Sequence, residues 1–144
     1  MRKRLAIAAT PLVAALIVTL GGSAQAATLS GTSLSGNSAI SGSYTSQADS
    51  TGDGRAKIDG RFDNVRLTDN IDGNGLGSAL VLEYDSFYLG TGWQHQGQYI
   101  SRTGSDGTTS WSFNDKANVK AWVCDYDSAG RWSNCRLILS NTQW

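Results

Sequence analysis

The sequence holds one histidine, His95, and any chemistry that needs an imidazole would have to be built on it. A serine hydrolase of the common type presents its nucleophile within a G-x-S-x-G turn, and the sequence has no such motif. Gln94 and Gln96 flank the histidine, while Trp93 and Tyr99 share its face of an alternating stretch. These neighbours are typical of a packed or interface histidine, so no catalytic residue is predicted there.

Two carboxylates form the other candidate for chemistry. Glu83 and Asp85 lie two residues apart, on one face of an apolar stretch. Glycoside hydrolases use paired carboxyl groups about 5–10 Å apart, so the spacing permits a small secreted hydrolase. Such pairs usually converge from different strands, whereas carboxylates at i and i+2 commonly belong to a solvated strand face. A hydrolase that uses Glu83 and Asp85 is therefore an alternative prediction.

Aromatic residues exceed what a lean core needs, since the chain has five Trp and five Tyr. Exposed aromatic rings on a β-face bind sugar rings or a partner's surface well, because they bring a large rigid area at low entropic cost. Core filling explains Trp93, which shares its parity with Tyr99. Trp122 is out of phase with its apolar neighbours, and Trp132 stands between the two cysteines. Trp122 and Trp132 are thus predicted as ligand-binding residues.

The segment Asp69–Gly75 offers oxygen ligands and a tight turn, which a calcium loop requires. Its spacing differs from D-x-[DN]-x-[DN]-G, and it has no glutamate at the bidentate position. Asp-Gly and Asn-Gly pairs also form turns without a metal, so calcium binding stays open. Two cysteines and one histidine do not complete a four-ligand zinc site. We predict no metal site and no cofactor.

The N-terminus has the three parts of a secretory signal. Arg2-Lys3-Arg4 is a positive start, residues 5–20 are an apolar run, and Ala24-Gln25-Ala26 is an A-x-A cleavage site. An uncleaved anchor would need about 20 apolar residues, and this run is shorter and contains Pro11. We therefore predict a signal peptide over residues 1–26, an exported chain that is extracellular or cell-wall associated, and no membrane span after cleavage.

Export gives the two cysteines a meaning, because a cysteine pair in an oxidising compartment is normally a disulfide. Cys124 and Cys135 flank Asp127–Gly130, which suits a type I turn between antiparallel strands. Closing so short a loop stabilises a small domain by about 3 kcal/mol in the chain-entropy model. There is no C-x-x-C spacing to indicate redox chemistry, so the predicted bridge is structural.

The formal net charge of zero includes three cations of the leader. Without them, nine cations face twelve anions, which leaves a net charge of −3. Nucleic acids and anionic membranes require clustered Lys and Arg, so neither is a predicted partner.

Two regions of different composition follow the leader. Residues 27–54 are rich in small residues, and 17 of the 27 residues from 28 to 54 are Ser, Thr or Gly. This composition suits half-exposed edge strands and also flexible segments, so both interpretations stand. Residues 55–144 are predicted to form a β-sandwich domain.

Alternating polarity predicts the strands of that domain. Ile58 and Phe62 share one face of a charged strand, and the alternation slips near Asp63-Asn64, which indicates a bulge. Further strands are predicted at 79–89, 93–103, 108–113, 119–124 and 135–139. No stretch shows the apolar spacing of an amphipathic helix. The predicted fold is all-β, a small antiparallel β-sandwich or barrel with one disulfide-closed C-terminal hairpin.

The leader, the Ser/Gly/Thr-rich start and the tail from Val119 to Cys135, with its sequence VKAWVC followed by GRWSNC, resemble small exported β-proteins of filamentous actinobacteria. The resemblance covers the leader and the last quarter of the chain. It implies export and carries over no catalytic or binding residue.

The absence of a convergent catalytic set, together with surplus aromatic residues, favours a secreted, non-enzymatic β-domain that acts by surface binding. Its partner would be a glycan, the cell envelope or another secreted protein. The alternatives are the small hydrolase described above and a structural cell-envelope protein.

Overall fold

The computed structural model describes residues 24–48, 57–102 and 108–141, with the side chains of 98–102 left undescribed. Within these ranges the chain is all-β and contains no helix, hence none long and apolar enough to cross a membrane. The strands are β1 (Gln25–Thr32), β2 (Ser38–Ala48), β3 (Ile58–Asp69), β4 (Leu76–Tyr88), β5 (Gly92–Arg102), β6 (Thr109–Asp127) and β7 (Trp132–Asn141).

The predicted signal peptide lies outside the described residues except at its end. β1 begins at Gln25, two residues before the predicted cleavage point after Ala26. β1 and β2 together occupy most of the Ser/Thr/Gly-rich region, whose last part, 49–54, lies outside the described residues. Leu29, Ile40 and Tyr44 of these two strands are buried, which fixes this region to the rest of the fold.

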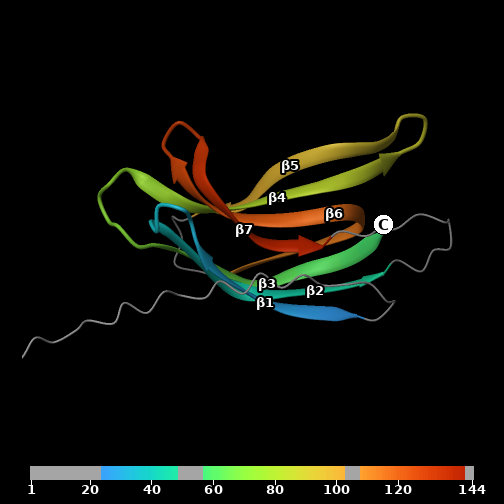
Figure 1. Cartoon of the computed structure of the whole chain (residues 1–144), viewed down its shortest axis with the longest axis horizontal. Coiled ribbons are helices and arrows are strands. Elements are labelled where there is room, and N and C mark those ends of the chain that lie inside the picture. The colour runs from blue at the N-terminus through green and yellow to red at the C-terminus, as the bar shows by residue number, and fades with distance from the viewer. Residues whose placement is uncertain (1–23, 49–56, 103–107, 142–144) are drawn as a thin grey trace, which may run out of the picture.

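The strands form one antiparallel hydrogen-bonded sheet in the order β1-β2-β3-β6-β4-β5, and β7 also pairs with β6. The sheet folds over itself into two layers (Figure 1). The lower layer consists of β1, β2, β3 and the first half of β6. The upper layer consists of β5, β4, the second half of β6 and β7. The prediction of a small antiparallel all-β fold is confirmed.

β6 joins the layers because it bends sharply in its middle. Lys116 pairs with β3 on one side of the bend and with β4 on the other. Asp115 and Asn118 have φ angles of 55° and 52°, a left-handed conformation that Asp and Asn tolerate better than most residues. The prediction of two separate strands at 108–113 and 119–124 is wrong, because the turn-forming residues between them bend one strand without ending it.

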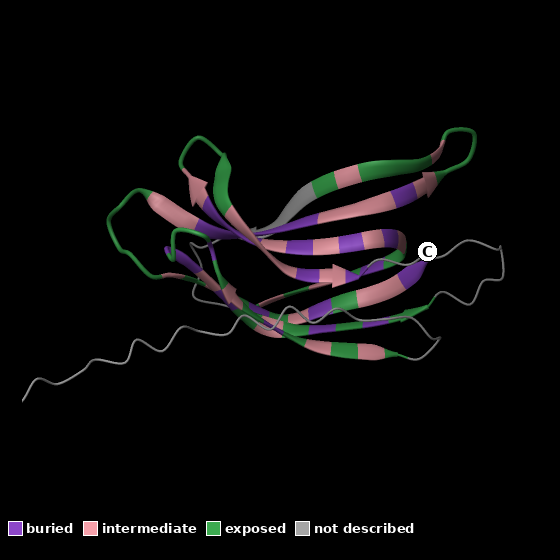
Figure 2. Cartoon of the chain, in the orientation of Figure 1, coloured by how far each residue is buried: buried purple, intermediate pink, exposed green. Residues whose placement is uncertain are grey.

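The core fills the space between the layers. Figure 2 shows buried and more exposed residues alternating along the strands, as expected when every second side chain points inward. Trp111 packs at its margin, with ring centroids 5.2 Å from Phe113 and 6.1 Å from Phe62. The buried core residues are Leu29, Ile40, Tyr44, Ile58, Phe62, Val65, Leu80, Leu82, Phe113, Val119, Ala121, Val123 and Leu139.

The predicted bulge in β3 is confirmed. The register of β3 against β6 shifts between Phe62 and Val65, and Asn64 has a φ of 52°. Both Phe62 and Val65 are buried although their positions differ by three, an odd number that would put them on opposite faces of a regular strand. The bulge therefore keeps the apolar side chains on the inner face across the slip in alternation.

The C-terminal hairpin is closed by the predicted disulfide between Cys124 and Cys135, whose Cα atoms are 4.1 Å apart. In the turn between β6 and β7, Oδ1 of Asp127 accepts hydrogen bonds from the backbone N–H groups of Ala129 and Arg131, each at 2.9 Å. These bonds, and the one from the Arg131 guanidinium, lower the pKa of the Asp127 carboxyl. The turn is thus held by its own side chains.

Candidate functional site

The upper layer turns every second side chain away from the core, and these side chains form what we call the outer face. The alternation follows from Leu80 and Leu82 of β4 pointing into the core, since their neighbours must point outward. Cross-strand register places on the outer face Val81, Glu83, Asp85 and Phe87 of β4, Trp93, His95 and Gly97 of β5, Asn118, Lys120, Trp122 and Tyr126 of β6, and Trp132 and Cys135 of β7.

Aromatic side chains occupy one end of the outer face. Trp132 lies opposite Tyr126 and is 45% exposed. Trp122 is half-buried and, like Tyr126, packs on a small apolar cluster that includes Val81 and Cys124. The indole Nε1 of Trp122 is buried without a hydrogen-bond partner, so packing alone holds this ring. Neither predicted binding residue, Trp122 or Trp132, belongs to the core between the layers.

A second aromatic pair occupies the other end of this face. Phe87 and Trp93 lie opposite one another and make an edge-to-face contact, with ring centroids 5.5 Å apart. Trp93 is 38% exposed, so the prediction that it fills the core is wrong. Its parity puts it on the outward side of the β4–β5 hairpin. Between Gly77, opposite Tyr126, and Phe87 the strand advances ten residues, or about 33 Å.

Polar residues lie between the two aromatic ends, and we call Glu83, Asp85, His95, Asn118 and Lys120 the polar patch. Nδ1 of His95 lies 3.1 Å from Oδ1 of Asp85, and Nδ2 of Asn118 donates to Oδ2 of the same carboxylate. The side chain of His95 is 67% exposed, so of the two interpretations its neighbours allow, a packed or an interface histidine, the packed one is wrong. The bend in β6 brings Asn118 to Asp85, and an asparagine inside an alternating stretch is the one sequence signal for it.

Glu83 and Lys120 are paired across β4 and β6 and are both half-buried. Neither side chain forms an ion pair or a hydrogen bond with any described residue. Gly97 lies opposite Glu83 on β5, and a Cβ added there would meet no described atom within 4 Å. The sequence correctly places Glu83 and Asp85 on one face. The structure shows that they differ, because Asp85 has hydrogen-bond partners and Glu83 has none among the described residues.

A second aspartate of the upper layer, Asp125 on β6, is fully buried on the inward side of that layer. Its carboxylate accepts hydrogen bonds from Oγ of Ser35 at 2.6 Å, Oγ of Ser38 at 2.8 Å and Nδ2 of Asn134 at 2.7 Å. Burial raises the pKa of the Asp125 carboxyl, but these bonds and a contribution from Ser33 outweigh it, so the pKa is lowered. Asp125 therefore fastens the β1–β2 loop to the C-terminal hairpin.

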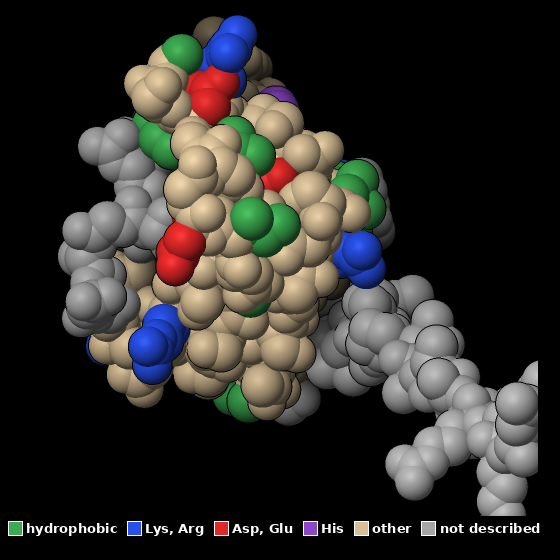
Figure 3. Space-filling view, turned by 90° about the vertical axis from the view of Figure 1, so that its left-hand side faces the viewer, with side chains coloured by type: hydrophobic (Ala, Val, Ile, Leu, Met, Phe, Trp, Pro, Cys, Tyr) green, Lys and Arg blue, Asp and Glu red, His purple; other side chains and the backbone are tan. Residues whose placement is uncertain are grey.

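The loops at the end of the molecule that carries the β6–β7 turn offer no site of comparable quality. In the calcium-like segment, Oδ1 of Asp69 accepts from the N–H of Ile71, and Oδ1 of Asn74 accepts from the N–H of Leu76. The described part of the chain contains no group of three or more His, Cys, Asp or Glu side chains that could hold a metal. Figure 3, which views this end, shows separate hydrophobic patches on a largely polar surface.

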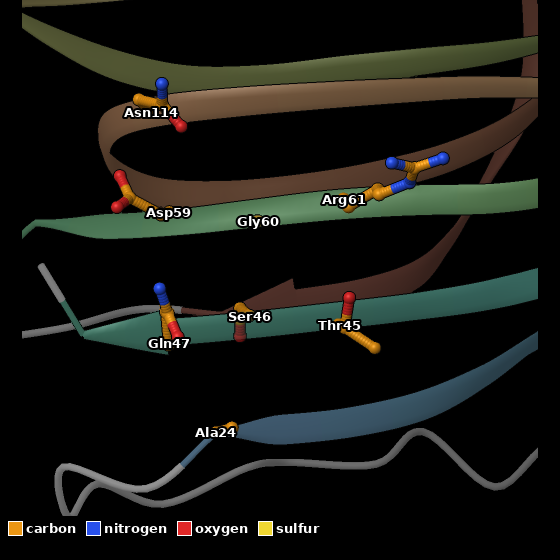
Figure 4. Close-up of a pocket in the computed structure, with 8 residues that line it drawn as sticks. All are labelled: Ala24, Thr45, Ser46, Gln47, Asp59, Gly60, Arg61 and Asn114. Atoms are coloured by element: carbon orange, nitrogen blue, oxygen red, sulfur yellow. The ribbon is translucent and has the colours of Figure 1, made fainter.

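A shallow hollow of about 220 Å³ lies on the other layer, near the bend of β6. Figure 4 shows its side chains spread along several strands, with Arg61 away from Asp59 and Asn114, and they converge on no common point. Ala24, which the predicted cleavage would remove, is part of its lining. The outer face is therefore the stronger candidate.

Comparison of this chain with protein-family models, with curated proteins and with solved structures yields no match.

Proposed function

We propose that this protein binds an extended glycan chain along the outer face of its upper layer. The observation that carries the proposal is the placement of two exposed tryptophans, Trp132 and Trp93, at opposite ends of one face with hydrogen-bonding side chains between them. Sugar rings present C–H faces that stack on flat aromatic rings and hydroxyl groups that both donate and accept hydrogen bonds. The outer face supplies partners for both.

The charge distribution favours a glycan over a protein partner. Protein interfaces are depleted of charged residues at their centre and carry them at the rim. On the outer face the order is reversed, because Glu83, Asp85 and Lys120 lie in the middle and the aromatic residues lie at the ends. A polar ligand that runs along the strands fits this arrangement.

The proposal includes export from the cell. The disulfide between Cys124 and Cys135 suits an oxidising compartment, and the N-terminal sequence has the order of a secretory signal. Extracellular and cell-wall glycans are the glycans that an exported chain would meet.

Affinity electrophoresis and pull-down with a panel of polysaccharides test the proposal. Trp132→Ala and Trp93→Ala should each weaken binding about tenfold, which corresponds to about 1.4 kcal/mol. Leu34→Ala is the control, because Leu34 is 65% exposed in the β1–β2 loop and is not one of the residues of the outer face. Saturable binding that both tryptophan variants leave unchanged would overturn the proposal, as would binding to no polysaccharide at all.

The alternative hydrolase would use Glu83 and Asp85. Both oxygens of Asp85 already accept or share hydrogen bonds with Asn118 and His95, which fits a positioning role better than that of a nucleophile. A reducing-end assay on the bound polysaccharides separates the two functions. Release of reducing ends that disappears in Glu83→Gln would establish the enzyme, and binding without release supports the proposed function. A structural envelope protein would instead stay with the cell and bind no soluble glycan.

A further inference from the structure

We infer that the polar patch is a subsite for a neutral sugar unit, so that the protein selects neutral over acidic glycans. This inference rests on the proposed glycan-binding function and adds the chemical class of the ligand. Three features of the described residues carry it: an unpartnered acceptor beside an unpartnered donor, an oriented imidazole, and open space above Gly97.

The unpartnered pair consists of Glu83 and Lys120. They face each other across β4 and β6, yet neither side chain has an ion-pair or hydrogen-bond partner among the described residues. Both are half-buried, so the approach of a ligand would remove water from groups that have no replacement partner within the fold. A sugar hydroxyl can donate to the Glu83 carboxylate while its neighbour accepts from the Lys120 ammonium.

The imidazole of His95 is held from one side. Asp85 engages Nδ1 at 3.1 Å, and Asn118 in turn holds the other oxygen of Asp85. Nε2 of the exposed ring has no described partner, and it can donate or accept a hydrogen bond according to the tautomer. Asp85 is therefore a positioning residue, and His95 is the group that would contact the ligand.

Gly97 leaves room for the ligand between these groups. It lies on β5 opposite Glu83, two residues from His95 on the same side of the strand. No described atom lies within 4 Å of the position that a Cβ would take, and the backbone there is not left-handed. A larger residue can therefore be placed at 97 without backbone strain, which makes this position a direct probe of occupancy.

The charge of the patch selects against acidic sugars. Two carboxylates, Glu83 and Asp85, face one ammonium, Lys120. A glycan that carries carboxylate groups would meet net repulsion in a partly desolvated place, where charges are poorly screened. A neutral sugar unit meets no such repulsion.

The test compares neutral with charged polymers and includes one pair that shares a cellulose backbone. We would measure the affinity of the purified protein for hydroxyethylcellulose and carboxymethylcellulose, for galactomannan and polygalacturonate, and for chitosan as a cationic polymer. The expected result is binding of at least one neutral polymer at least tenfold tighter than of every charged one. Glu83→Gln, which keeps the shape and removes the charge, should reduce this discrimination at least threefold.

Gly97→Val should weaken binding of the neutral polymer at least tenfold while the melting temperature stays within a few degrees of the parent. Thr45→Val on β2, an exposed strand position of the lower layer, is the control and should leave affinity unchanged. Equal affinity for neutral and acidic polymers, tighter binding of chitosan, or full affinity in Gly97→Val would overturn the inference. If the inference failed in this way while Trp132→Ala still weakened binding about tenfold, the proposed function would stand alone. Binding to no polymer would remove both the inference and the proposed function.

Discussion

Two aspartates of the upper layer have the same local arrangement and different surroundings. Asp125 and Asp85 each accept a hydrogen bond from the side chain of an asparagine in left-handed conformation, Asn134 with φ of 49° and Asn118 with φ of 52°. Asp125 points inward and is covered by the β1–β2 loop, whereas Asp85 points outward and its second partner is an exposed imidazole. Burial thus separates a carboxylate that holds the fold together from one that orients an exposed imidazole.

The two aspartates show that some polar groups of this small domain bond within the fold while others on its surface have no described partner. Around Asp125 the hydrogen-bonding capacity is used within the fold, because Ser35, Ser38 and Asn134 all donate to it. Around Asp85 part of the capacity is left over, since Glu83 and Lys120 have no described partner. Stability should therefore depend on the first cluster, and binding on the second.

Reduction of the disulfide should have the largest effect on stability. The bridge joins the residue before Asp125 to the residue after Asn134, so it staples the buried cluster and not the exposed one. Reduction should lower the free energy of unfolding by about 3 kcal/mol. Urea unfolding of the oxidised and the reduced protein measures this change, and an unchanged midpoint after confirmed reduction would contradict it.

Replacement of Asp125 should follow in size. Asp125→Ala removes the acceptor of three donors, of which Ser38 is buried and Ser35 and Asn134 are exposed, and we expect a loss of about 1–3 kcal/mol in unfolding free energy. As a control, replacing an exposed serine of β2, as in Ser41→Asn, should change the free energy of unfolding by less than about 0.5 kcal/mol. An Asp125→Ala protein as stable as the parent would mean that the buried cluster has no structural role.

The contribution of Asp125 should also depend on pH. Because the pKa of the folded Asp125 carboxyl is lowered, its stabilisation is fully present above the ordinary aspartate pKa of about 3.9 and is lost as the pH falls through the lower folded value. The difference in unfolding free energy between the parent and Asp125→Ala should thus shrink in acid. A difference that grows as the pH falls would reverse the assigned sign.

Replacement of Asp85 should have the smallest effect on stability. Its contact with His95 involves an imidazole that is 67% exposed, so Asp85→Ala should cost less than about 1 kcal/mol. The same variant should weaken glycan binding, because it releases the imidazole from its fixed orientation. A large loss of stability with unchanged binding would show that the two aspartates have the same role.

The sequence alone predicts those parts of the fold that depend on local pattern. Alternation identifies the strands and the bulge near Asp63-Asn64. The leader indicates export to an oxidising compartment, where Cys124 and Cys135 are expected to form the disulfide that the structure contains. The buried cluster escapes prediction because Ser35 and Asp125 are 90 positions apart. The exposure of Trp93 could not be predicted, because alternation divides the side chains of a strand between two faces and does not say which face packs against the other layer.

The outer face can be tested most directly by following the indole N–H signals of the tryptophans by NMR during titration with a neutral polysaccharide that the protein binds. Trp132 and Trp93 lie on the proposed binding face, and Trp111 at the margin of the core is an internal reference. The signals of Trp132 and Trp93 should shift in a saturable manner while that of Trp111 stays in place. Saturable shifts confined to residues of the lower layer, with Trp132 and Trp93 unaffected, would contradict the proposed binding face.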